Sequence, residues 1–596
     1  MQLEYKNQRL ERYLIGINVV LAGFVAASFV LLFGFREPQL PAELLYSAQV
    51  LLLVSFIGIK VVRFFNAVSL REFWRANWYE IPLLLGLVVV LIGAGRWFFM
   101  EAGEPSQARH FAVGIYLVVQ VVAKVCKASV NLAASGKNPT QTLITSFVVL
   151  IVTGAGLLML PRASTGERLS FVDALFTSTS ATCVTGLIVK DTGEDFALMG
   201  QVVILTLIQL GGLGIVVFGA VFALLLGQAL SVRESVAMQD LLSASTLSRI
   251  GNMIAFIFVG TIAIEAVGAM ALMGMWGDVP GKVGGVDERW FCSIFHSISA
   301  FCNAGFSLFE DSFEAYNRSW QVYAIICPLI VLGGLGFSVL YDLSNLTSDR
   351  IKRFFKRRVN KQYKLSMEAP KRMRLQTKIV LSVSAVLIVG GMLVLLALER
   401  YSIGSSGGAR TGVLDALFQS VTARTAGFNT IDISGMSAAG RFVLILLMFI
   451  GGSPGSTAGG IKTVTLVVIL MTAVTALRRR WEVEIFKRSV RVVTPGRAIT
   501  IVLLFIAVLI GSSLALSITE SGRGFTMSDV MFEAASALGT VGLTTGITPS
   551  LTTPGKLIII ALMLVGRLGP LTLLAALTFN LKPIRYNYPV EAVVVG

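Results

Sequence analysis

Charged and metal-binding side chains are scarce in this sequence. Only 14% of its 596 residues are charged, whereas soluble domains average about a quarter. It contains two histidines, His110 and His296, and five cysteines without CxxC or zinc-like spacing. The sequence therefore gives little support to a disulfide framework, a metal centre or acid–base catalysis.

Hydrophobic residues take the place of the missing charges. They make up 55% of the chain, and the mean hydropathy is +0.77. Apolar runs of about 18 or more residues recur, and each can cross a bilayer. They include residues 14–32, 81–92 if continued to 100, 142–160, 202–226 and 499–516. The first run has no obvious small-residue cleavage site, so we expect a retained helix and not a signal peptide. The predicted fold class is an all-α polytopic membrane protein.

The net charge of +16 is concentrated between the apolar runs. Residues 349–378 and 478–497 hold large basic clusters, which the positive-inside rule places in the cytoplasm. We therefore expect a multi-pass protein of the plasma (inner) membrane, with a cytoplasmic N-terminus, lipid contacts and no nucleic acid partner.

Residues 1–137 form a first unit with four candidate spans. The spans lie near 14–33, 43–64, 79–100 and 111–131. Their connections fit an even count, because basic side chains follow the second span and acidic ones follow the third. These charges are Lys60, Arg63, Arg71 and Arg75 on the inner side, and Glu101 and Glu104 on the outer side.

The remainder of the chain contains a fourfold internal repeat. Residues 173–187, 292–306, 415–428 and 529–543 each have an early Phe, a Ser/Thr/Ala-rich middle and a terminal Gly. The Phe-to-Gly separations are 10, 10, 9 and 10 residues. A glycine cluster follows each segment, at 211–214, 333–336, 451–455 and 566–569. Each repeat is thus predicted to hold an apolar span, a short half-polar segment and a second apolar span. The expected units are 138–230, 231–345, 346–478 with a cytoplasmic linker, and 479–596 with a C-terminal tail.

The half-polar segments suit a pore. A re-entrant segment is tolerated at membrane depth when it is buried in protein or lines a water-filled cavity. Short helices would aim their partially negative C-terminal ends at a cation, and inward carbonyls would replace its hydration shell. Glycine adopts the backbone angles that such carbonyls need. The predicted filter residues are Thr182, Cys183, Val184, Thr185, Gly186, Cys302, Asn303, Ala304, Gly305, Arg424, Thr425, Ala426, Gly427, Thr540, Val541 and Gly542.

Two further features lie in the second spans. Arg567 stands where the other repeats carry glycine; we expect either a cationic barrier below the filter or a structural arginine paired with inward carbonyls. The stretch 449–463 is too rich in glycine for one straight helix, so it is either a flexible gate, a packing kink or a surface loop. The gate residues would be Gly451, Gly452, Ser453, Gly455, Ser456, Thr457, Gly459, Gly460 and Lys462.

Several motifs resemble signatures of the Trk/Ktr/HKT potassium transporter superfamily. They are FHSISAFCNAGFS, FQSVTARTAGFNTID, GGSPGSTAGGIKT, EAASALGTVGLTTG and GRLGPLT. GRLGPLT and the ending YPVEAVVVG are more similar to the KtrB branch. The resemblance covers about residues 140–596.

The resemblance implies a detailed architecture. Four membrane-pore-membrane repeats would surround one pore in pseudo-fourfold arrangement, with the loop at about 450–463 as gate and Arg567 in the pore. Glycine at the first filter position, here Gly186, goes with potassium preference, and serine with sodium transport. Potassium would be the only ion held, at the filter, without an organic cofactor. The resemblance also implies a homodimer and a separate cytoplasmic ring of nucleotide-binding regulatory subunits (KtrA/TrkA-like), for which the basic linkers are plausible docking surfaces.

The residues alone leave other functions open. An ion-coupled secondary transporter with alternating access usually shows inverted repeats, whereas these repeats are parallel. A membrane enzyme needs convergent acid or metal-binding groups, and Glu265 stands alone in its span. A non-conducting structural protein would not explain four filter-like glycines. The helices of residues 1–137 lie outside the family pattern, and Lys124 and Lys127 are too few charges for a voltage sensor.

Overall fold

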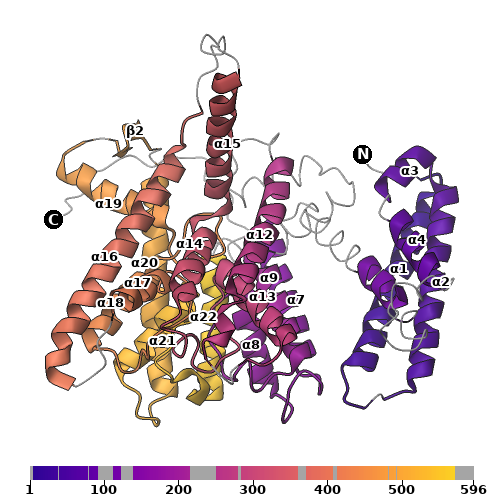
Figure 1. The fold of residues 1–596 in the computed structure, drawn as a ribbon, viewed down its shortest axis with the longest axis horizontal. Helices are drawn as coiled ribbons and strands as arrows, with labels where there is room; N and C mark the ends of the chain where they lie inside the picture. Colours follow the sequence, from indigo (N-terminus) through magenta and orange to yellow (C-terminus); the bar gives the residue numbers. More distant parts are fainter. Residues whose placement is uncertain are drawn as a thin grey trace, which may run out of the picture.

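The structure is a computed structural model, and the residues that it describes are mostly helical. It describes residues 5–37, 39–77, 80–91, 110, 112–121, 139–214, 250–279, 283–359, 371–406, 412–480, 482–490 and 493–570. The first helices are α1 (Gln8–Phe33), α2 (Ala42–Asn66), α3 (Leu70–Ala76) and α4 (Glu80–Leu91). They form a group of their own at one side of the molecule, next to α7 (Figure 1). The candidate third and fourth spans extend beyond the described residues. Glu101, Glu104, Lys124 and Lys127 also lie outside the described residues.

The rest of the chain repeats one arrangement of a long helix, a short helix and a further helix. The first set is α7 (Pro139–Leu158), α8 (Phe171–Cys183) and α9 (Leu198–Leu213), and the second is α12 (Ile250–Leu272), α13 (Val286–Cys302) and α14 (Cys327–Leu335), with a π-helical turn at Val322–Ile326. The third set is α16 (Leu375–Ser406), α17 (Val413–Thr422) and α18 (Ala438–Phe449). The fourth is α20 (Val493–Thr519), α21 (Met527–Gly539) and α22 (Thr553–Leu568). We call these sets repeats 1 to 4, and α8, α13, α17 and α21 the short helices.

Other elements lie outside these sets. They include α15 (Phe337–Val359), α19 (Thr463–Leu477) and a two-stranded hairpin of β1 (Glu484–Ile485) and β2 (Arg488–Ser489). Figure 1 shows α15 projecting beyond the bundle of the other labelled helices.

The repeated phenylalanine anchors each short helix in the core. Phe176, Phe295, Phe418 and Phe532 are all completely buried. Burying an aromatic side chain is a major stabilising contribution, which explains why each motif carries Phe at this place. The long helices α16 and α20 instead expose large apolar side chains, such as Val386, Leu393, Leu503 and Ile510, as a lipid-facing surface requires.

The last glycine of three clusters ends the helix that precedes it. Gly214, Gly336 and Gly569 have φ angles of 80°, 88° and 83°, a left-handed region that glycine enters without a Cβ clash. At Gly336 the chain bends by 103° between α14 and α15. The second apolar segment of repeat 2 is therefore bent at its glycine cluster. The predicted run 202–226 is interrupted too, because α9 ends at Leu213; residues 215–226 lie outside the described part.

The described helices are long and apolar enough for a multi-pass membrane protein. Five of them could cross a bilayer by length and composition, or six if the bent pair counts as one span. Two of the five, Gln8–Phe33 and Ala42–Asn66, belong to the N-terminal group.

Candidate functional site

Four glycines from the four repeats lie next to one another in a closed ring. A Cβ placed on Gly186 would lie 2.5 Å from the carbonyl oxygen of Ala304, and one on Gly305 would lie 2.7 Å from that of Ala426. A Cβ on Gly427 would likewise meet Val541 O, and one on Gly542 would meet Thr185 O. Each glycine thus packs against the carbonyl that precedes the glycine of the next repeat. The order of contacts is 1, 2, 3, 4 and back to 1.

The backbone has the same alternating conformation at all four places. The residue two before each glycine has a positive φ, of 57° at Val184, 60° at Asn303, 74° at Thr425 and 50° at Thr540. The ring glycines themselves have φ angles between 69° and 94°. A left-handed conformation is costly for Val and Thr, so the surrounding contacts hold it in place.

The hydrogen bonds that hold these turns repeat as well. The N–H of Thr185, Ala304 and Val541 donates to the carbonyl five residues earlier, in each case at 2.8 Å. In repeat 3, Ala426 N–H donates to Thr422 O four residues earlier, also at 2.8 Å. The shorter turn explains why the Phe-to-Gly separation is nine residues there and ten elsewhere.

Hydroxyls of the short helices fix the segment from behind. Ser180 Oγ accepts from Gly186 N–H and Ser536 Oγ accepts from Gly542 N–H, both at 3.1 Å. Ser299 Oγ donates to Phe306 O at 2.8 Å and Thr422 Oγ1 donates to Phe428 O at 2.6 Å. The Ser/Thr content of the motif therefore serves the backbone of the ring.

Some predicted filter residues lie slightly before the ring. Thr182, Cys183 and Cys302 belong to the last turn of their helices, where carbonyls lack intrahelical partners. Gly211 packs directly against Thr182 O. The glycine clusters thus allow close approach to the ends of the short helices, and Gly566 does the same against Leu538 O.

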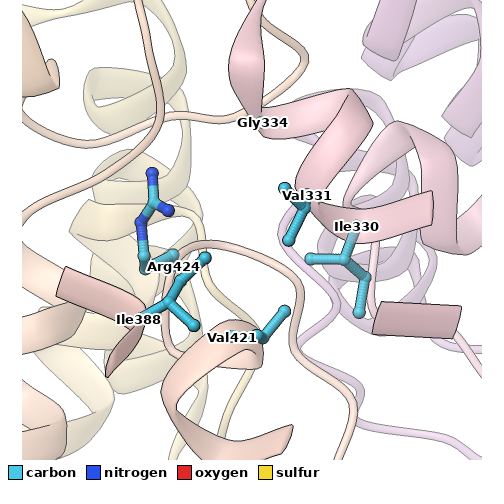
Figure 2. A pocket seen from close by; sticks show the side chains of 6 residues that line it. All are labelled: Ile330, Val331, Gly334, Ile388, Val421 and Arg424. Carbon is cyan, nitrogen blue, oxygen red and sulfur yellow. The ribbon is translucent and has the colours of Figure 1, made fainter. Parts of the chain in front are cut away.

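Arg424 points its side chain away from this backbone. Figure 2 shows it beside a small cavity that Ile388, Val421, Ile330, Val331 and Gly334 also line. Arg424 Nη2 donates to Ser384 Oγ at 3.1 Å. No carboxylate pairs with this arginine among the residues that the structure describes. Only its backbone takes part in the repeated turn.

The predicted gate stretch is not helical, as expected. We call residues 450–462, between α18 and α19, the crossing segment. It closes on itself, because Gly451 N–H donates to Ile461 O at 2.9 Å and Thr463 N–H donates to Gly452 O at 3.1 Å. Gly460, with φ of 67°, packs against Gly451.

The crossing segment is bonded to repeat 2 and to the start of α15. Ser453 N–H donates to Gly334 O at 3.0 Å, and Phe337 N–H donates to Gly455 O at 2.9 Å. Thr457 Oγ1 donates to Phe301 O, the carbonyl near the end of α13, at 3.4 Å. The segment therefore lies in the interior of the protein and not on its surface.

The same segment also contacts repeat 4, whose Arg567 links it to repeat 1. Arg567 donates to Thr457 O and Gly211 O, and its Nη2 lies 3.3 Å from Gly212 O. Gly459 packs against Thr540 Oγ1. Arg567 therefore pairs with carbonyls, as in the structural alternative to a cationic barrier, and this pairing joins the crossing segment of repeat 3 to repeats 1 and 4. Within the segment, Ser456 Oγ donates to Ser453 O at 2.7 Å and Lys462 Nζ donates to Ala458 O at 2.6 Å.

Sequence reasoning missed a set of contacts between neighbouring repeats. Lys556 Nζ pairs with Asp173 Oδ1 at 2.6 Å, which links repeat 4 to repeat 1. Arg441 Nη1 pairs with Asp529 Oδ1 at 2.9 Å, and Tyr323 Oη donates to Asp415 Oδ1 at 2.8 Å. Each acid stands three residues before the buried Phe. This shared Asp is visible in three of the four motifs and was the available signal; repeat 2 has Cys292 there.

A second missed set lies within repeats. Asp278 accepts from Ser319 Oγ at 2.6 Å, Glu399 from Ser437 Oγ at 2.7 Å, and Glu520 from Thr552 Oγ1 at 2.5 Å. In repeats 3 and 4 the hydroxyl is the N-cap of the next helix. These carboxylates fasten α18 and α22 to the ends of the long helices.

Two other acidic residues, Glu265 and Asp191, accept hydrogen bonds in different parts of the protein. Glu265 accepts from Gln209 Nε2 at 3.2 Å, a hydrogen bond between helices α12 and α9. Asp191 lies in the loop after Gly186, where its Oδ1 accepts from Gly193 N–H and Glu194 N–H at 2.7 and 2.8 Å. Burial raises the pKa of Asp191; these two N–H groups oppose the rise, and the charges of Glu310 and Asp195 add to it.

The fold defines a multi-pass helical membrane protein, and comparison with known proteins identifies its family. The family described as "TrkH: Cation transport protein" matches residues 106–582. The chain therefore belongs to this family of cation transport proteins, within the Trk/Ktr superfamily, and not to a family of enzymes.

Curated relatives agree with this assignment. The chain is 36% identical to the potassium/sodium uptake protein NtpJ of Enterococcus hirae over 464 residues, which are 77% of this chain and 97% of that protein. It is 40% identical to Ktr system potassium uptake protein B of Bacillus subtilis over 441 residues, 73% of this chain and 92% of the relative.

A solved structure has a similar fold. The potassium transporter TrkH from Vibrio parahaemolyticus aligns with a TM-score of 0.55 and 19% identity, over 85% of this chain and 98% of that chain. At this identity the likeness concerns the fold alone.

Proposed function

We propose that this chain conducts potassium ions into the cell through a filter made by the four-glycine ring. Four membrane-pore-membrane repeats would surround one pore in pseudo-fourfold arrangement. The observation that carries the proposal is the closed ring of contacts from Gly186 through Gly305 and Gly427 to Gly542. A ring of four equivalent turns presents four equivalent sets of carbonyls to one axis, as a dehydrated cation needs.

The ion follows from the relatives and from one residue. Relatives are named as potassium uptake proteins of Ktr systems and as a potassium/sodium uptake protein. Gly186 occupies the first filter position, where glycine goes with potassium preference in the superfamily that the motifs resemble. Potassium is the transported substrate, and no organic cofactor is required for this role.

The crossing segment and Arg567 supply the gate and the barrier of the proposed pore. The segment touches repeats 2 and 4 below the ring, and Arg567 joins it to repeat 1. A guanidinium under a cation filter opposes passage of the ion electrostatically. Opening would separate Thr457 from Phe301 and Arg567, so that the segment and the arginine move aside together.

The proposed setting is the plasma (inner) membrane, with the N-terminus and α15 on the cytoplasmic side. The chain would act as a homodimer under a separate cytoplasmic ring of nucleotide-binding subunits. Support comes from α15, which projects from the bundle (Figure 1) and carries Arg350, Lys352 and Arg353. Basic charge beside a membrane span also fits the positive-inside rule.

Potassium and sodium flux into liposomes tests the proposal. The parent should pass potassium in strong preference, and Gly186→Ser should admit sodium, because its Cβ would press on Ala304 O and Gly305. Gly156→Ser is the matched control, since a Cβ there meets no other atom within 4 Å. If the parent is silent, Arg567→Ala is tested next. Silence of that variant as well would contradict the pore and favour an ion-coupled transporter.

A further inference from the structure

The residue directly after the buried phenylalanine is polar in all four short helices. The four residues are Thr177, His296, Gln419 and Glu533. Each is at most 1% exposed. A buried polar side chain is costly unless it is hydrogen-bonded, so the partners of these four residues indicate what each one does.

Glu533 is bonded to the segment that follows the last ring glycine. Its Oε1 accepts from Thr545 N–H at 3.2 Å and from Thr544 Oγ1. Its Oε2 accepts from Thr548 Oγ1 at 2.8 Å. Three donors from residues 544–548 therefore converge on one carboxylate, and Thr544 is only two residues after Gly542.

His296 makes the corresponding contact in repeat 2. Its Nδ1 lies 2.8 Å from Cys292 O; because a carbonyl only accepts, Nδ1 carries the proton. Nε2 is then an acceptor, and it lies 3.4 Å from Leu308 N and 3.2 Å from Ser307 Oγ. Ser307 is two residues after Gly305, so His296 also holds the segment beyond its ring glycine.

The other two repeats lack this arrangement. Thr177 Oγ1 and both polar atoms of Gln419 have no hydrogen-bond partner among the described residues. Since the ring runs in the order 1, 2, 3, 4, repeats 2 and 4 face each other across it. The residue after the phenylalanine therefore adds support beyond the ring glycine on two opposite sides of the ring, and not on the two sides between them.

We propose that Glu533 and His296 are positioning residues that set the discrimination between potassium and sodium at the ring. The proposal rests on the proposed pore function. It assigns to these two side chains the task of positioning the ring carbonyls. Each side chain fixes the chain just beyond its glycine, and so fixes where the ring carbonyls stand. A loosened ring contracts around a smaller ion more easily, which raises sodium passage.

The substitution Glu533→Gln separates positioning from packing. Glutamine keeps the shape of the side chain but removes its charge, and hydrogen bonds to a neutral acceptor are weaker than those to a carboxylate. Thr548 Oγ1 would have to turn from donor to acceptor if Nε2 takes the place of Oε2, because a hydroxyl can do both. Thr548→Val is a second variant, which removes one donor and leaves the carboxylate intact. Thr177→Val is the matched control, because it alters the equivalent position of repeat 1, whose hydroxyl is unpaired among the described residues.

The measurement is potassium and sodium flux in liposomes made with the full chain, as a function of ion concentration. We expect Glu533→Gln to raise the sodium-to-potassium flux ratio on the order of tenfold, because hydrogen bonds to a charged group are strong. The half-saturating potassium concentration should rise as well. Thr548→Val should raise the sodium-to-potassium flux ratio and the half-saturating potassium concentration by less. Thr177→Val should change neither of these two quantities.

The outcomes distinguish this inference from the proposed function. A parent that conducts potassium together with an unchanged ratio in Glu533→Gln would contradict the inference alone. An equal shift in Thr177→Val would also contradict it, since the effect would then be general packing. If Glu533→Gln does not fold, the ratio in Thr548→Val decides. A parent without potassium flux would overturn the pore and this inference together.

Discussion

At the scale of single residues, the ring glycines have no room for a side chain. A Cβ on Gly305 would lie 2.7 Å from Ala426 O and 2.9 Å from the Cα of Gly427. The positive φ of each ring glycine adds strain for any residue with a Cβ. Sterics and backbone angle therefore both favour glycine, and any one substitution, including Gly186→Ser, should displace the neighbouring repeat too.

Arg567 is the charge most open to a direct test. Arg567→Ala removes the cation under the ring and its hydrogen bonds to Thr457 O and Gly211 O. We expect potassium flux in liposomes to rise roughly tenfold, which corresponds to a barrier lower by about 1.4 kcal/mol. Arg567→Lys retains the charge and should stay much closer to the parent. Unchanged flux in Arg567→Ala would reduce the arginine to a structural role.

Asp191 should give uptake through the proposed pore a dependence on the outer pH. Burial raises the pKa of this carboxyl, so as the outer pH falls it is neutralised above the ordinary Asp value of about 3.9. Its negative charge concentrates cations at the entrance when ionised. Potassium uptake below saturation should therefore decline as the outer medium is acidified towards that range.

The variant Asp191→Asn tests this origin of the pH dependence. It should lower uptake at neutral pH by roughly twofold and flatten the early part of the acid decline, measured as flux against outer pH. Glu194→Gln removes an exposed charge from the same loop and should leave the decline in place. An acid decline that is identical in Asp191→Asn would contradict this role.

The sequence showed the ring residues but not their supporting partners. Gly186, Gly305, Gly427 and Gly542 could be predicted because the motif recurs four times in register. Carbonyl partners for Arg567 were one alternative, but the particular residues could not be predicted, since they lie 110 positions away in one case and 356 in the other. The type of a residue does not reveal whether its backbone carbonyl accepts a hydrogen bond from a distant side chain.

At the scale of helices, side chains near the start of the short helices tie the repeats together. Asp173, Asp415 and Asp529 each accept from the last helical segment of the preceding repeat in the ring. A carboxylate in the first turn also interacts favourably with the helix dipole. Each acid therefore stabilises its own short helix and one junction.

A double-mutant cycle tests the junction between repeats 4 and 1. Lys556→Met and Asp173→Asn should each lower the melting temperature, because the remaining partner is left unpaired at 16% or 18% exposure. The double variant should be less destabilised than the sum, with a coupling of about 1 to 2 kcal/mol. The control is Lys190→Met, at an exposed lysine of another loop, which should combine additively with Asp173→Asn. If the destabilising effects of Lys556→Met and Asp173→Asn are additive, the two residues do not stabilise the junction between repeats 4 and 1 as a pair.

The helix breaks illustrate where sequence pattern fails. The cluster GGLG at 333–336 lies inside an apolar run and is compatible with a continuous span, yet α14 ends there and the chain turns by 103°. The deciding contact is with the crossing segment, because a Cβ on Gly336 would lie 2.8 Å from Pro454 O. Such a contact is tertiary, and periodicity does not reveal it. The break at 450–462 was predictable because glycine is far denser there and proline interrupts the run.

At the scale of the whole molecule, the ring joins segments that are distant in the chain. Contacts between repeats 4 and 1, such as Gly542 with Thr185 O, close the circle. The N-terminal helices stand outside this circle (Figure 1). They touch repeat 1 through Arg36, which donates to the carbonyls of Pro161, Ser164, Thr165 and Gly166. Their presence was predictable from hydropathy, but this contact was not.

The position of a bound cation decides whether the ring is a filter. We would determine the structure of the purified protein in rubidium or thallium, which substitute for potassium, and locate the ion by anomalous scattering. We expect an ion on the axis of the ring, among the carbonyl oxygens of Thr185, Ala304, Ala426 and Val541. An occupied cation site elsewhere in the membrane region, with none at the ring, would contradict the proposed filter.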